Sequence, residues 1–135
     1  MHVQVKIRAA SRALRLLVAE DEAVIALGLK QFLLSAGHDV CGIVATADDA
    51  VAAAGRLHPD LVLMDIMLRN GDGVDAACSI WEAYRIRSLF MSALDMATQR
   101  DRAAAAYPLG FLTKPYRCED LLSRLEQAAC AGIGA

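Results

Sequence analysis

The sequence predicts an α/β fold in which a doubly wound, five-stranded parallel sheet is covered by five helices, giving three αβα layers. Three observations lead to this prediction. Short apolar runs alternate with longer helical patterns five times along the chain. The runs are continuously apolar, which is typical of strands buried on both faces. The chain has 135 residues, a hydrophobic fraction of 56% and a net charge of -2, which fits one domain with a sizeable core.

The elements of the first half follow from local patterns, beginning with the apolar run 14–19, which predicts a strand. Residues 23–37 predict a helix, because large apolar residues fall on one helical face and a glycine ends the pattern. Those residues are Ile25, Leu29, Phe32, Leu33 and Gly37. The run 39–45 predicts the second strand. A helix over 47–57 is expected to begin at Thr46, which is followed three residues later by an acid, as in a capping box.

The second half continues the alternation with three apolar runs and three helical segments. The predicted strands are residues 60–64, 87–93 and 110–114. The predicted helices are residues 74–84, 96–107 and 118–130. The second of these helices is rich in alanine and is broken by Pro108. The last is amphipathic and is expected to direct Leu121, Leu122 and Leu125 inward.

Polar residues follow four of the five apolar runs. Glu20 and Asp21 come after the first run, Asp65 after the third, Ser92 ends the fourth, and Lys114 ends the fifth. In an open parallel sheet, sites form at the carboxyl ends of the strands. We therefore expect three acids, a hydroxyl and a lysine to lie on one edge.

This combination predicts a particular chemistry. Clustered carboxylates raise one another's pKa, and a divalent cation removes that conflict. All-oxygen ligands suit Mg²⁺, while Lys114 adds positive charge and Ser92 a donor. Such a site is suited to a phosphoryl group beside a metal. The expected nucleophile is a carboxylate, because Ser92 has no nearby base and no catalytic histidine is apparent.

The pattern resembles the receiver domain of two-component response regulators, from about residue 14 to residue 129. The acidic pair of the receiver pattern corresponds to Glu20 and Asp21, and its phosphoacceptor corresponds to Asp65. Its switch hydroxyl with the following small residue corresponds to Ser92-Ala93, and its aromatic switch corresponds to Phe111. Its lysine–proline pair corresponds to Lys114-Pro115, and its Asp-Gly pair corresponds to Asp72-Gly73. The resemblance implies the flavodoxin-like strand order 2-1-3-4-5, a known order of doubly wound sheets. That order makes the first and third strands neighbours.

The resemblance also implies roles for individual residues. Asp65 is expected to accept the phosphoryl group, with Lys114 contacting it and with Ser92 and Phe111 as the two switch residues. The expected cofactor is Mg²⁺, with Mn²⁺ as a substitute. Its expected ligands are Asp21, Asp65 and the backbone carbonyl of Met67, and Glu20 through water.

Two positions depart from the usual receiver pattern. Proline is common four residues after the phosphoacceptor, and this chain has Arg69 there. We expect a more mobile loop and a partner contact by this arginine. Many receivers have aspartate where this chain has Glu20, so we rank Glu20 below Asp21 as a metal ligand.

The implied function is a phosphoacceptor switch that takes a phosphoryl group from a sensor histidine kinase or a histidine phosphotransfer protein. Output to a downstream protein is expected through the face of the fourth helix, fifth strand and fifth helix, and homodimerisation through that face stays open. Two alternatives remain: the receiver portion of a longer hybrid kinase or regulator, and an aspartate-nucleophile phosphatase. Such phosphatases usually carry a second acid where this chain has Met67, which transfers no proton.

The chain ends carry weaker signals. The expected parts are a basic extension over 1–13, a receiver domain over 14–131 and a tail over 132–135. Residues 1–15 hold four basic residues and no acid, and the alternation in 2–8 leaves an edge strand open beside a mobile tail. No apolar run approaches about 18–20 residues, and no leader pattern or Cys-x-x-Cys pair is present. We expect a cytoplasmic protein with reduced thiols that binds neither DNA nor membranes.

Overall fold

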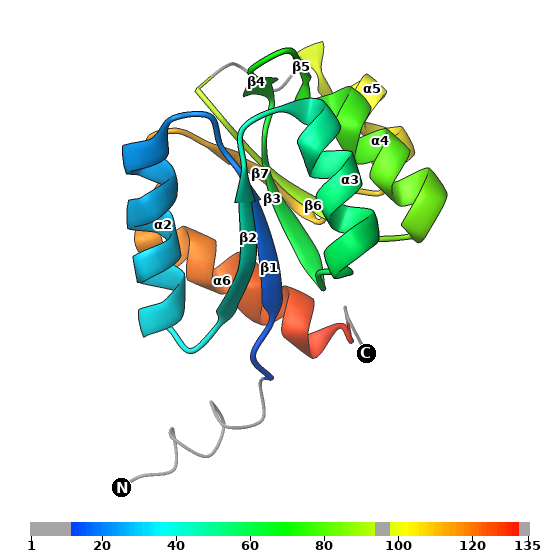
Figure 1. The fold of residues 1–135 in the computed structure, drawn as a ribbon. Coiled ribbons are helices and arrows are strands. Elements are labelled where there is room, and N and C mark those ends of the chain that lie inside the picture. Colours follow the sequence, from blue (N-terminus) through cyan, green and yellow to red (C-terminus); the bar gives the residue numbers. More distant parts are fainter. Residues whose placement is uncertain (1–11, 94–97, 133–135) are drawn as a thin grey trace, which may run out of the picture.

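The computed structural model describes residues 12–93 and 98–132 and contains the predicted five-stranded parallel sheet (Figure 1). Its strands are β1 (Arg15–Ala19), β2 (Asp39–Val44), β3 (Leu61–Asp65), β6 (Ser88–Ser92) and β7 (Gly110–Thr113). The helices are α2 (Ala23–Ser35), α3 (Ala47–Leu57), α4 (Gly73–Tyr84), α5 (Arg100–Ala103) and α6 (Cys118–Cys130). The order β2-β1-β3-β6-β7 is the predicted 2-1-3-4-5. The predicted fold class is therefore confirmed.

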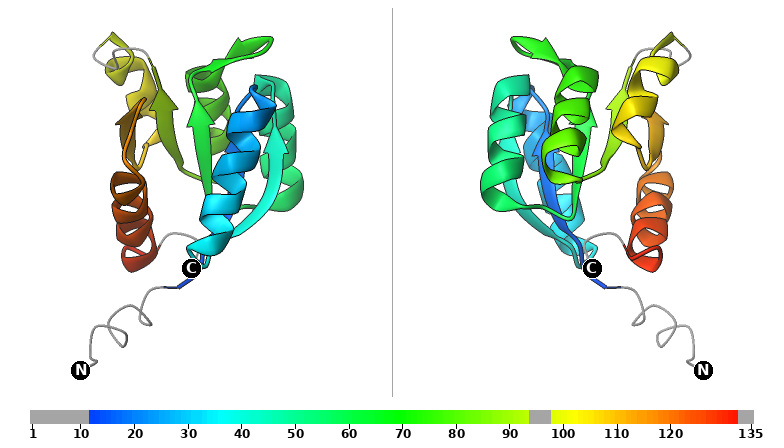
Figure 2. Two further views of the ribbon diagram at one scale, coloured as in Figure 1. Left: turned by 90° about the vertical axis from the view of Figure 1, so that its left-hand side faces the viewer. Right: turned by 90° about the vertical axis from the view of Figure 1, so that its right-hand side faces the viewer.

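The three central strands, β1, β3 and β6, bury both faces, which explains their continuous apolar character. Alternate side chains of a strand point to opposite faces of the sheet. On β1, Leu16 and Val18 join the core under α2 and α6, while Leu17 and Ala19 join the core under α3, α4 and α5. Figures 1 and 2 show these two groups of helices on opposite faces of the sheet. The three-layer arrangement thus follows from the strand composition.

A short hairpin absent from the prediction follows β3. Its strands are β4 (Met67–Leu68) and β5 (Gly71–Asp72), which pair antiparallel. Asn70 takes the left-handed conformation at the tip, with φ 57°. The hairpin lies beside the carboxyl ends of the parallel strands, at the top of Figure 1. The loop after Asp65 therefore has defined pairing at the edge expected to hold the site.

The predicted helix over 96–107 is wrong in its extent. Helix α5 has 4 residues and continues as a 3-10 turn, η2 (Ala104–Ala106). Only alanines, Ala103 and Ala106, are buried in this segment, so little apolar area is available to stabilise a longer helix. The turn ends at Tyr107, directly before Pro108, where helical backbone is disfavoured.

Smaller predictions are confirmed or corrected by the packing. Thr46 caps α3 by accepting a hydrogen bond from the Asp49 N–H at 3.0 Å, as predicted. Leu29 and Leu33 are buried, but Ile25 is 42% exposed because it lies toward the solvent side of α2. Leu121 and Leu125 are buried, and Leu122 is half-buried.

Some expectations fall outside the described residues. The segment 2–8, for which an edge strand stayed open, and the start of the predicted helix at 96–107 are among them. Within 12–93 and 98–132, no helix combines the length and the apolar character that crossing a bilayer requires.

Candidate functional site

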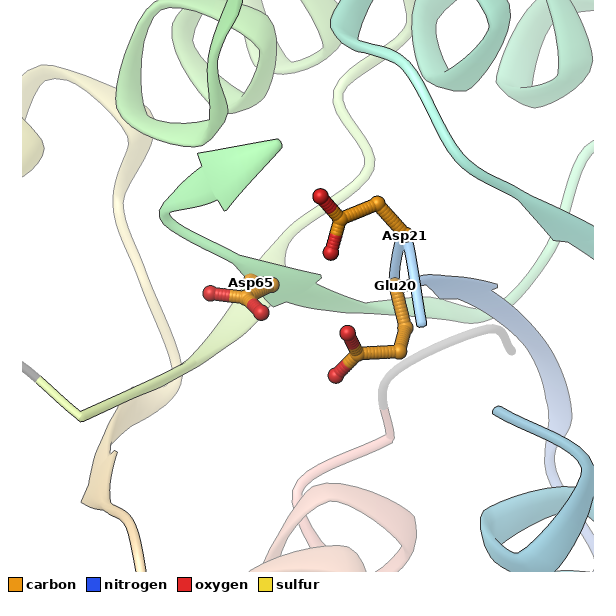
Figure 3. Close-up of side chains that lie close together, drawn as sticks. All are labelled: Glu20, Asp21 and Asp65. Atoms are coloured by element: carbon orange, nitrogen blue, oxygen red, sulfur yellow. The ribbon is translucent and has the colours of Figure 1, made fainter. Parts of the chain in front are cut away.

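Three carboxylates converge at the carboxyl edge of the sheet, as predicted. Glu20 and Asp21 directly follow β1, and Asp65 ends β3, which is paired with β1 up to Ala19 and Met64. One carboxylate oxygen from each of the three acids lies within 4.8 Å of the others. Figure 3 shows Glu20 and Asp21 reaching toward Asp65. The adjacency of β1 and β3 is therefore what assembles the acidic cluster.

Lys114 enters this cluster from β7, two strands away from β3. Its Nζ donates to Glu20 Oε1 at 2.8 Å and to Asp65 Oδ2 at 3.1 Å. The Glu20 side chain is buried, and its second oxygen accepts the Glu22 N–H at 3.1 Å. Both oxygens of Glu20 are thus engaged within the chain. One lysine faces three acids, so the cluster keeps an excess of negative charge suited to a hard divalent cation.

The pKa values of the paired groups reflect this environment. Burial raises the pKa of Asp65, with the Glu20 charge adding to the effect, while Lys114 and the Met67 N–H oppose it. Burial alone would lower the pKa of Lys114. The hydrogen bonds and the negative charges of Glu20 and Asp65 outweigh this effect, so the pKa of Lys114 is raised. Lys114 is therefore cationic at neutral pH, whereas ionised Asp65 carries a desolvation cost that its partners offset only in part.

Ser92 lies at the end of β6, between the strands that carry Asp65 and Lys114. Asp65 is in register with Met91, and the Lys114 N–H donates to the Ser92 carbonyl at 2.7 Å. The Ser92 side chain is 1% exposed. The predicted hydroxyl is thus on the expected edge, next in sequence to the partner of Asp65.

Phe111 lies between a core ring and a cation. Its ring stacks on Phe90 with centroids 5.4 Å apart, and the Arg100 guanidinium lies 4.6 Å from the Phe111 centroid. Phe111 is half-buried on β7, three residues before Lys114. This contact joins α5 to β7, the strand directly before Lys114, and no local sequence pattern indicates Arg100 as a partner of Phe111.

The residues that follow Asp65 lie close to its carboxylate and its backbone. The Met67 N–H donates to Asp65 Oδ1 at 3.2 Å, while the Met67 side chain is 59% exposed. Asp72 caps α4 by accepting from Val74 N–H at 2.6 Å. A Cβ on Gly73 would lie 2.0 Å from the Asp65 carbonyl oxygen, so only glycine fits this approach. The Asp-Gly pair noticed in the sequence thus starts α4 against the strand end.

Two arginines near the site, Arg69 and Arg102, form contacts that the sequence did not predict. Arg69 Nη2 donates to the backbone carbonyl of Asp21 at 2.9 Å, an intramolecular contact. Arg102 on α5 forms ion pairs with Asp72 and Asp75, each at 2.9 Å. The partners are 27 to 48 residues apart in sequence, and no local pattern connects them.

Comparison with known families decides the family. The family model of the response regulator receiver domain matches residues 16–126 of this chain. The chain belongs to this family. Receiver domains are signalling modules of two-component systems that bind Mg²⁺ in an acidic pocket and interact with kinases and effectors. The acidic cluster at this edge is the corresponding pocket of this receiver.

Individual relatives agree with the family. The chain is 33% identical over 114 residues to the transcriptional regulatory protein PdtaR of Mycobacterium tuberculosis, covering 84% of this chain and 56% of PdtaR. It is 29% identical over 123 residues to the phyllosphere-induced regulator PhyR of Methylorubrum extorquens, covering 89% of this chain and 45% of PhyR. The chain thus spans about half the length of these curated relatives.

A solved structure carries the same fold. The signal receiver domain of a modulated diguanylate cyclase from Desulfovibrio desulfuricans is 30% identical, with a TM-score of 0.81 over 89% of this chain and 96% of that domain. This chain is therefore similar in sequence and in architecture to the receiver domain of a diguanylate cyclase.

Proposed function

We propose that this receiver is a phosphoacceptor switch in which Asp65 takes a phosphoryl group from a protein phosphohistidine. The observation that carries the proposal is the convergence of Asp65 with Glu20 and Asp21 within 4.8 Å, and with Lys114 Nζ at 3.1 Å. A carboxylate held beside a lysine and two further acids is suited to attack on an anionic phosphorus centre.

The step is a displacement at phosphorus. An Asp65 oxygen forms the new O–P bond, the P–N bond to the donor imidazole breaks, and the imidazole leaves with its electron pair and takes up a proton. Lys114 and the Ser92 hydroxyl are proposed to donate to the phosphoryl oxygens, and such positioning dominates phosphoryl transfer. The nucleophile needs no general base, because a carboxylate already carries the lone pair that attacks phosphorus.

Mg²⁺ fits the donor set, and Mn²⁺ would substitute for it. We propose Asp21 and Asp65 as its side-chain ligands and the Met67 carbonyl as its backbone ligand. Glu20 would act through water, because its two oxygens already accept from Lys114 and from Glu22 N–H. The cation would neutralise charge on the transferring phosphoryl oxygens.

The proposed output surface consists of α5 with η2, β7 and α6. Phe111 on β7 and Arg100 on α5 are in contact, so a shift of the Ser92 edge would reach both. Output is proposed as contact with a downstream protein, or with a second copy of the chain. A PhyR from Bartonella quintana is an anti-anti-sigma factor, which makes a protein regulator one class of target to test.

The proposed boundaries are a basic extension over residues 1–13, the receiver over 14–131 and a tail over 132–135. Either an independent switch or the receiver portion of a longer hybrid protein is compatible with these boundaries. Transfer assays against all histidine kinases of the source organism would identify the cognate donor for both arrangements.

Labelling by a small phosphodonor tests the function directly. Incubation with acetyl phosphate and Mg²⁺ should add one phosphoryl group per chain, removable by hydroxylamine as an acyl phosphate, and EDTA should prevent it. Intact-protein mass spectrometry gives the stoichiometry. No labelling with Mg²⁺ would overturn the proposal. Continuous release of phosphate from p-nitrophenyl phosphate would instead support an aspartate-nucleophile phosphatase.

Asp21→Asn tests the metal assignment. The change removes one carboxylate ligand and should weaken Mg²⁺ binding by about tenfold or more, since even loss of an outer partner costs that much. Isothermal titration calorimetry measures the affinity. The fold should persist, because the substitution also relieves repulsion among the acids. Asp39→Asn, an equal charge change on an exposed residue of β2, is the control. Equal Mg²⁺ affinity in the two variants would place the cation elsewhere.

A further inference from the structure

Arg69 connects three loops at the functional edge. Its side chain reaches the loop after β1 by donating to the Asp21 carbonyl at 2.9 Å. Its backbone N–H donates to the Ala45 carbonyl at 3.2 Å, and the residue forms a bridge with Thr46, both in the loop after β2. Arg69 itself lies at the tip of the hairpin that follows Asp65. One residue therefore links the three loops that follow β1, β2 and β3.

The loop after β1 needs such support. The ladder between β1 and β3 ends at Ala19 and Met64, so Asp21 lies two residues beyond the last pair of that ladder. The Glu20 N–H is held by the Val44 carbonyl at 2.9 Å, but the peptide carbonyl of Asp21 is held by Arg69. The direction in which the Asp21 carboxylate points depends on this peptide.

The partner of Arg69 is a carbonyl and not a carboxylate. Within residues 12–93 and 98–132, Arg69 forms no ion pair within 4.0 Å, whereas Lys114 pairs with two of the clustered acids. The Asp21 carboxylate is thus not neutralised by this arginine and stays available to a cation. Arg69 acts on the backbone, while the charge of the acidic cluster is left to Lys114.

We propose that Arg69 is a positioning residue that holds the Asp21 loop in register with the loop after Asp65 and thereby sets the affinity for Mg²⁺. This inference rests on the proposed function, because it assumes that Asp21 is a metal ligand. Arg69 touches neither the phosphoryl group nor the cation. Its loss should therefore change how much Mg²⁺ is needed, and not the rate once the site is filled.

The sign of the effect separates positioning from charge. A guanidinium near the site repels a divalent cation, so a purely electrostatic role predicts tighter Mg²⁺ binding when Arg69 is removed. Loss of positioning predicts weaker binding. At 0.5 M KCl the Debye length falls to about 4 Å, and the repulsion is largely screened, while a direct hydrogen bond persists. Affinities measured at high salt therefore report the positioning contribution.

The experiment compares three variants of the full chain with a matched control. Arg69→Ala removes the side-chain bond, Arg69→Pro removes that bond and the N–H bond to Ala45, and Arg69→Lys keeps a charged donor. Arg56→Ala removes the same charge from an exposed residue near the far end of α3. Calorimetric Mg²⁺ titration in 0.5 M KCl gives the affinity, and acetyl phosphate labelling at saturating Mg²⁺ gives the maximal rate.

We expect the Mg²⁺ dissociation constant to rise about three- to tenfold in Arg69→Ala and at least as much in Arg69→Pro, the range for loss of one hydrogen bond. Arg69→Lys should recover part of the affinity, and Arg56→Ala should match the parent chain. Maximal labelling rates should agree within about twofold.

Unchanged or tighter Mg²⁺ binding in Arg69→Ala at high salt would overturn the inference, as would a lower maximal rate with unchanged affinity. If Asp21→Asn weakens Mg²⁺ binding in the same assay, such a result rejects only the role of Arg69. If the parent chain binds no Mg²⁺, the proposed function fails and this inference fails with it.

Discussion

Asp65→Asn should abolish phosphorylation by acetyl phosphate while making the metal-free protein more stable at neutral pH. The first effect follows from chemistry, because the amide is a poor nucleophile and cannot form the aspartyl phosphate. The second follows from burial, which raises the pKa of Asp65 and makes its ionised form costly in the folded state. The neutral asparagine has nearly the same shape and avoids that cost.

The stability gain of Asp65→Asn should depend on pH in a defined direction. A folded-state pKa above the ordinary value of 3.8 means that ionisation of Asp65 lowers stability as the pH rises through that folded-state pKa. The gain should be complete above that folded-state pKa and vanish below the ordinary value, where Asp65 is protonated in both states. Thermal unfolding in EDTA across this range measures it, with Asp39→Asn as the control. Phosphorylation of the variant at stoichiometric level would reject Asp65 as the acceptor.

Gly73→Ala should destabilise the fold by about 2–3 kcal/mol, the upper part of the range for overpacking. The new Cβ would lie 2.0 Å from the Asp65 carbonyl oxygen and 2.8 Å from the Ile66 Cα. Both obstacles are backbone atoms, so no side-chain rotation relieves the clash. The Gly73 N–H also donates to the Ile66 carbonyl at 2.7 Å, which keeps α4 against the strand end. The labelling rate should fall too, because relief of the clash displaces Asp65.

Gly28→Ala is the matched control for this prediction. Gly28 lies inside α2, and a Cβ there would meet nothing within 4 Å. Removing a glycine from a helix interior should stabilise the protein by up to about 1 kcal/mol. Chemical denaturation of both variants should therefore give changes of opposite sign. Equal stability of Gly73→Ala and the parent chain would mean that α4 moves away from Asp65 at no cost.

The sequence by itself determined the fold class and the composition of the site. Continuous apolar runs such as the one ending at Ala19 can be recognised as strands from the sequence, because a strand buried on both faces has no polar alternation. Glu20, Asp21, Asp65 and Lys114 were predicted to meet because they follow such runs, and parallel strands end on one edge. The capping of α3 by Thr46 was equally local.

The tertiary structure decided the contacts that connect these parts. The Arg69 bond to Asp21 spans 48 positions and the Arg102 bond to Asp72 spans 30, so neither leaves a periodic signal. The shortness of α5 also depends on packing, since its alanines favour a helix but bury too little apolar area to extend one. Local patterns encode burial and turns within a segment. Which side chains from distant segments meet depends on how the loops beyond the strand ends close over one another.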